Sequence, residues 1–165
     1  MEQQSTLKIS ERKSLLKAII LAGLTIGLLD GIAAMVSAYI PREITPDKVF
    51  RYVASGVFGK DAFAGGTPMA LFGLLCHFTV AMGWTALFFL LYPRLKFLSW
   101  NKYVIGILYG VFVLFSMNLV VVPISNVPNP NTGSVHLPQL FIHMFLVGLP
   151  ISLMANRYYS RLQAS

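Results

Sequence analysis

The chain has 165 residues, of which 56% are hydrophobic and only 12% are charged, and its mean hydropathy is +0.68. Soluble domains carry about twice that share of charged residues, so the composition predicts a multi-span membrane protein of one domain. The formal net charge is +7, but the basic residues flank apolar runs, and no zinc-finger spacing or RNP-like motif is present, so the charge indicates lipid headgroups and topology rather than nucleic acid.

The first predicted element is a membrane span over residues 18–40, which follows a basic tail over residues 1–17. An apolar run from Lys17 to Tyr39 is close to the length that crosses a bilayer, and Pro41 ends it. The run is too long for the core of a signal peptide, so we interpret it as a retained span. Asp30 lies near its middle, where a carboxyl is costly and is by default a functional candidate.

The connector over residues 41–67 contains a predicted amphipathic helix at about 46–58. Thr45 fits the N-cap, Pro46 the first helical position and Asp47 the positive end of the helix. Valines recur every fourth residue, at Val49, Val53 and Val57. This pattern predicts an interfacial helix on the bilayer surface between the first two spans.

Three further spans are predicted at about 68–92, 103–123 and 138–156, before a tail over 157–165. The loop over 124–136 has no Lys, Arg, Asp or Glu and is rich in Pro and Asn, so we expect it to be irregular. Gly148 and Pro150 predict a kink in the last span. The fold class is therefore an all-α membrane protein, with a single domain of four transmembrane helices in a bundle over residues 18–156.

The basic residues predict the topology. The N-terminal tail, the 93–102 loop and the C-terminal tail hold four, three and two Lys and Arg, whereas the connector holds four and the 124–136 loop none. This distribution favours an orientation with both termini in the cytoplasm.

Glycines four residues apart mark two helix faces for close packing. Gly23, Gly27 and Gly31 lie in the first span, and Gly106 and Gly110 in the third. Such faces let helix backbones approach each other. Asp30 borders the first glycine face, so we expect its side chain to point into the bundle.

Each span carries one embedded polar residue of interest: Asp30, His77, Asn118 and His143. With alternating span directions, all four fall in the outer half of the membrane, which predicts a shared polar cluster. Each also has a plainer interpretation as a hydrogen-bonded packing residue.

Three functions fit this cluster. Asp30 and the histidines could relay protons or handle a small solute, because histidine changes charge between about pH 5 and 8. His77 and His143 could ligate haem, or hold a divalent metal together with Asp30. Alternatively, the polar residues fix helix register in a homo-oligomer or in an accessory subunit of a membrane complex. No G-x-S-x-G or H-E-x-x-H motif is present, so an enzyme is disfavoured.

Several stretches resemble the YagU-like family, a group of bacterial membrane proteins without an assigned activity. The resemblance is carried by Ala54–Gly59, Ala62–Gly66, Gly73–Phe78, Phe141–His143 and Gly148–Pro150. It implies four spans and an inner-membrane location. A link of such proteins to acid tolerance would suit a titratable core.

Overall fold

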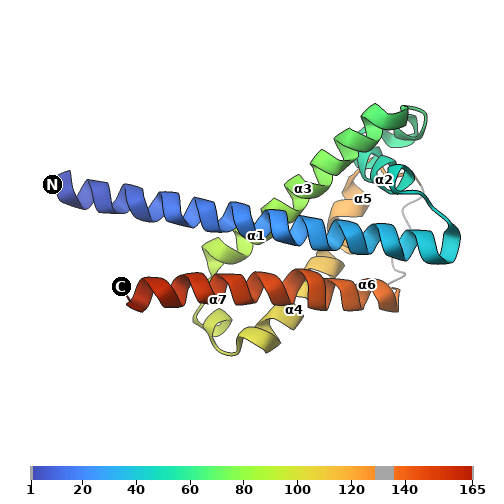
Figure 1. The fold of residues 1–165 in the computed structure, drawn as a ribbon. Helices are drawn as coiled ribbons and strands as arrows, with labels where there is room; N and C mark the ends of the chain where they lie inside the picture. The colour runs from blue at the N-terminus through green and yellow to red at the C-terminus, as the bar shows by residue number, and fades with distance from the viewer. Residues whose placement is uncertain (1, 129–135, 165) are drawn as a thin grey trace.

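The computed structural model describes residues 2–128 and 136–164, and side chains from residue 12 onward within those ranges. It confirms the predicted bundle of four apolar helices, with no strand in the described part of the chain (Figure 1). The helices long and apolar enough to cross a membrane are Arg12–Arg42, Gly66–Leu91, Lys102–Ile124 and Leu137–Ala164. Each predicted span coincides with one of them, and the last helix continues beyond the predicted end at 156.

Helix α1 (Glu2–Arg42) joins the predicted basic tail and the first span into one continuous helix. Residues 2–22 contain no glycine or proline, so nothing in the sequence interrupts the helix before it reaches the apolar run. Pro41 is the first proline of the chain, and α1 ends one residue later. The N-terminal part of α1 extends beyond the rest of the bundle (Figure 1).

Helix α2 (Pro46–Phe58) and the short 3-10 helix η1 (Gly59–Phe63) form the connector, and they lead into α3 (Gly66–Leu91). Thr45 is the N-cap residue and Pro46 is the first helical residue, as predicted. The contact between α2 and α3 is so close that a Cβ atom on Gly73 would overlap the backbone oxygen of Phe50. Part of the apolar face of α2 therefore packs on protein, although the sequence pattern predicts that it lies on lipid.

A charged cluster stabilises the start of α2. The Thr45 hydroxyl donates to the Asp47 carboxylate over 2.5 Å, and the Arg51 guanidinium forms an ion pair with the same carboxylate. Arg51 also donates to the backbone oxygen of Phe63 over 2.7 Å, which ties α2 to η1.

The Asp47 cluster predicts a pH-dependent contribution to stability. The hydrogen bond from Thr45, followed by that from Arg51, lowers the pKa of Asp47 below its ordinary value of 3.8. A lowered pKa in the folded state stabilises the fold above the unfolded-state pKa, and this is lost as the pH falls through the folded-state pKa. We expect Asp47→Asn to unfold slightly more easily than wild type at pH 7, with a difference that begins to shrink as the pH falls below about 4 and vanishes only below the folded-state pKa. Thermal unfolding of both proteins at several pH values measures this, and a constant difference would contradict it.

The third and fourth membrane helices each contain a π-helical turn. The third consists of α4 (Lys102–Ser116), the π segment η3 (Met117–Val121) and α5 (Val122–Ile124), and follows the 3-10 helix η2 (Lys96–Ser99). The fourth consists of α6 (Leu137–Ile142), the π segment η4 (His143–Gly148) and α7 (Leu149–Ala164). Most of the predicted irregular loop, residues 129–135, lies outside the described residues.

Both π segments end just before a proline. Pro123 follows η3, and Pro150 follows η4. A proline inside a helix lacks an N–H group, and its ring clashes with the carbonyl four residues earlier. A wider turn relieves that clash, and the structure has a π turn at the position where the sequence predicts a kink, Gly148 and Pro150. Such turns are frequent at functional sites.

The two glycine faces predicted from the sequence both lie at close contacts between membrane helices. Gly23, Gly27 and Gly31 lie on the face of α1 that contacts α3, where added Cβ atoms would meet Met82, Phe78 and His77. On α4, Gly106 and Gly110 lie against the backbone of the fourth helix. Gly148 of η4 faces both of them, so glycine meets glycine at this crossing.

Candidate functional site

Three of the four polar residues singled out in the sequence line one cavity. Asp30 of α1, His77 of α3 and His143 of η4 border a partly open space of about 120 Å³, and Val53 of α2 lines it at the connector end. The remaining lining residues are mainly apolar: Ile26, Val80, Ala81, Trp84, Val113, Met117 and Val147. The site is thus a small, largely apolar chamber with three titratable side chains, contributed by three of the spans.

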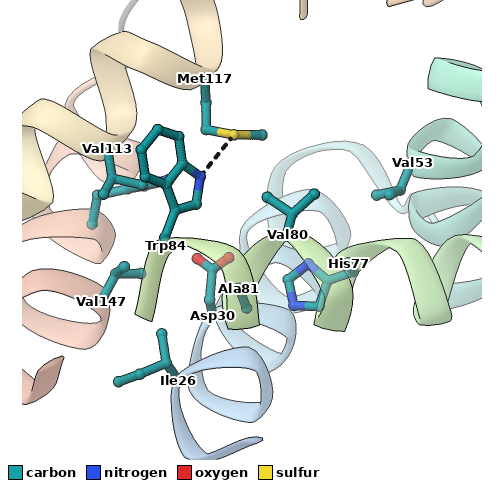
Figure 2. Close-up of a pocket in the computed structure, with 11 residues that line it drawn as sticks. Ile26, Asp30, Val53, His77, Val80, Ala81, Trp84, Val113, Met117 and Val147 are labelled. Atoms are coloured by element: carbon teal, nitrogen blue, oxygen red, sulfur yellow. Dashed lines mark hydrogen bonds between the residues drawn. The ribbon is translucent and has the colours of Figure 1, made fainter. Parts of the chain in front are cut away.

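Asp30 is half-buried, and Figure 2 shows its carboxylate pointing into the space bordered by Trp84, Val80 and His77. Among the described side chains the only ion pair is that of Arg51 with Asp47, and no hydrogen bond to the Asp30 carboxylate is formed. A carboxyl group in apolar surroundings needs a donor, a cation or water. The cavity has room for several water molecules, which could supply those hydrogen bonds.

His77 is held by the glycine face of α1. Its Nε2 atom lies 2.9 Å from the backbone oxygen of Gly27. Because a carbonyl oxygen only accepts, Nε2 carries the proton, and Nδ1 of a neutral ring is left as an acceptor. A Cβ atom on Gly31 would lie 3.2 Å from Nε2, so this glycine gives the imidazole room beside α1.

His143 is the first residue of the π segment η4. Its Nδ1 atom lies 2.9 Å from the backbone oxygen of Gln139, one turn earlier. By the same reasoning Nδ1 donates, and Nε2 is left free to accept a proton. Each histidine therefore keeps one ring nitrogen for proton exchange while the other fixes the orientation of the ring.

Asn118 does not line the cavity. Its side-chain amide donates to the backbone oxygen of Leu114 over 2.9 Å, within its own helix. The sequence predicts that it joins Asp30 and the histidines, because its depth matches theirs. Depth alone does not give the rotation of a helix about its axis, and Asn118 lies in the π segment η3, where the regular helical period is broken.

Sequence reasoning missed Trp84 and Met117 as lining residues. The Trp84 indole N–H donates to the Met117 sulfur over 3.3 Å, and this bond closes one side of the cavity (Figure 2). A signal was available, because Trp84 follows His77 by two helical turns and so lies on the same face of α3. Nothing in the sequence marks Met117 in this way.

The geometry does not provide a set of ligands for the divalent metal proposed as an alternative function. In the described ranges, no group of three or more His, Cys, Asp and Glu side chains comes together as metal ligands. Asp30, His77 and His143 share a cavity, but their arrangement does not form such a group.

Comparisons with models of protein families, with curated proteins and with solved structures give no match. The functional argument for this protein therefore depends on its own residues and their geometry.

Proposed function

We propose that this is a small integral membrane protein in which Asp30, His77 and His143 handle protons, alone or with a small solute, inside the bilayer. The resemblance to YagU-like proteins supports a location in a bacterial inner membrane. Nine of the thirteen Lys and Arg residues are on the side of the termini, which supports an orientation with both termini in the cytoplasm. A titratable cavity also suits the acid tolerance linked to the YagU-like proteins that the sequence resembles.

The observation that carries this proposal is the Asp30 carboxylate, which has no ion-pair partner among the described side chains and lies in a chamber that it shares with two histidines. Ionisable residues within membrane spans are expensive to bury, and they mark proton relays and ion pathways. Each imidazole has one ring nitrogen bonded to a backbone carbonyl and one available. A proton can thus pass between the carboxylate and an imidazole through cavity water without breaking the bonds that orient the rings.

A second candidate function is structural, as a homo-oligomer or an accessory subunit of a larger membrane complex. It is favoured by the bonds of His77, His143 and Asn118 to backbone carbonyls, which are what packing residues form in a membrane bundle. Under this alternative the polar residues set helix register, and none of them transfers protons.

Proton flux into proteoliposomes distinguishes the two candidates. Purified protein is reconstituted with a pH-sensitive dye inside the vesicles, and flux is driven by an imposed potassium diffusion potential. We expect wild-type protein to conduct protons and Asp30→Asn to reduce the flux to the level of vesicles without protein, because an amide cannot exchange a proton at these pH values.

Asp61→Asn is the matched control, since Asp61 is an exposed acid of η1 outside the cavity. It should conduct as wild type does. The proposal is overturned if Asp30→Asn conducts as well as wild type, or if wild-type vesicles conduct no more than vesicles without protein.

A further inference from the structure

A second hollow lies at the opposite end of the bundle from α2, between the first part of α1 and α7. Its volume is about 370 Å³, and it is lined by three groups of residues. Two arginines, Arg157 and Arg161, stand one turn apart on α7, and Ser14 of α1 adds a hydroxyl. The other lining residues are aromatic or apolar: Ala18, Leu21, Phe89, Met154, Tyr158 and Leu162.

The lining of this hollow, which we call the groove, is polar toward the chain termini and apolar farther from them. Ser14 and Arg161 lie toward the chain termini, whereas Leu21 and Met154 lie about two turns nearer the middle of the chain along their helices. The Phe89 and Tyr158 rings lie 6.2 Å apart, centroid to centroid. Positive charge at the headgroup end, a tyrosine near it and an apolar floor below match the shape and polarity of one phospholipid.

The charges of the groove have no protein partner in the described part of the chain. Arg157 and Arg161 are both exposed, and neither forms an ion pair there. The surrounding end of the molecule is strongly basic: it carries nine Lys and Arg against two acids, Glu2 and Glu11. The other end carries four basic residues against three acids. The excess positive charge of the sequence therefore belongs to the same end of the molecule as this groove.

We infer that the groove between α1 and α7 binds an anionic phospholipid, with the phosphate between Arg157 and Arg161 and an acyl chain along Leu21 and Met154. Arginine suits this role because its planar guanidinium pairs with two phosphate oxygens at once. Basic pockets between helices at the cytoplasmic side bind acidic headgroups in other membrane proteins. The site is independent of the cavity at Asp30, so either proposal can fail without the other.

Native mass spectrometry tests the lipid site on the intact protein. The detergent-solubilised chain is titrated with phosphatidylglycerol or phosphatidylcholine of equal acyl length. We expect phosphatidylglycerol to bind more tightly, and the double variant R157Q/R161Q to lose about 30-fold in affinity for it, since each basic residue near an anionic headgroup contributes a factor of about five. Equal affinity of wild type for the two lipids would overturn the inference, and this comparison needs no variant to fold.

The double variant K13Q/K96Q is the charge-matched control. Lys13 and Lys96 are exposed at the same end of the molecule, but neither lines the groove. It should keep wild-type affinity for phosphatidylglycerol; an equal loss would mean that bulk surface charge, and not the groove, holds the lipid. Inorganic phosphate at millimolar concentration should not displace the bound lipid, and displacement would reduce the site to a simple anion site and overturn the lipid assignment.

Discussion

Gly148→Ala is expected to lower the free energy of unfolding by about 3 kcal/mol, at the upper end of what overpacking a close contact costs. The Cβ atom would lie 2.6 Å from the Cα atom of Gly110 and closer still to the backbone oxygen of Gly106. No side chain there can rotate away, because the opposing atoms belong to the backbone of α4. Thermal unfolding in a mild detergent, with helix content followed by circular dichroism, measures the loss.

Gly83→Ala is the matched control and should change stability in the opposite direction. Gly83 lies in the middle of α3, and a Cβ atom there would meet nothing within 4 Å. Alanine is favoured over glycine in a helix by about 0.8–1 kcal/mol, so this variant should be slightly more stable than wild type. If Gly148→Ala and Gly83→Ala unfold alike, the close approach of α4 and η4 does not contribute to stability in the way proposed here.

The spans were predictable because each one is marked by many consecutive residues of the same kind, and no contact with another part of the chain is needed to recognise it. Any run of about 20 apolar residues with few charges must form a helix in a bilayer, where every backbone group needs an internal partner. The glycine spacing of α1 was informative for a similar reason, since residues four apart share a helix face. Asp30 borders that face, and this was enough to predict that its side chain points into the bundle.

The details of the site were harder to predict, because they depend on how each helix is rotated about its axis. Depth along a span follows from residue number, and it grouped Asn118 with Asp30 and the histidines. Rotation depends on contacts between helices and on the π turns before Pro123 and Pro150. A single extra residue in a turn shifts every later side chain around the helix, so depth matching alone cannot identify the members of a cluster.

Helix α2 is another element for which the sequence predicts the helix but not its contacts. Its valine period and its capping residues predict an amphipathic helix, and that helix is present. The pattern identifies an apolar face but not what covers it, because lipid and protein favour the same side chains. Only the tight contact of Gly73 with Phe50 reveals that α3 takes part of this face.

Asp30→Leu is expected to raise the free energy of unfolding by about 1 kcal/mol, at the low end of what burying a polar group costs, because the carboxylate is half-buried and cavity water could supply part of its hydrogen bonds. The carboxylate has no hydrogen bond or ion pair within the described part of the protein, and it faces a cavity in which a leucine side chain can be accommodated. A residue kept at a cost to stability is retained for its chemistry. The structural alternative predicts the opposite sign, because there Asp30 would contribute to helix packing.

Thr25→Leu controls for the added hydrophobicity of α1. Thr25 is exposed on the same helix, and its hydroxyl donates only to the Leu21 backbone oxygen over 2.8 Å. Because its side chain lies outside the cavity, this variant should unfold close to wild type. If Asp30→Leu destabilises the bundle while Thr25→Leu does not, Asp30 acts as a packing residue and the proton proposal loses its main support. If Asp30→Leu stabilises the bundle and also abolishes flux, the acid contributes to transport at the expense of stability.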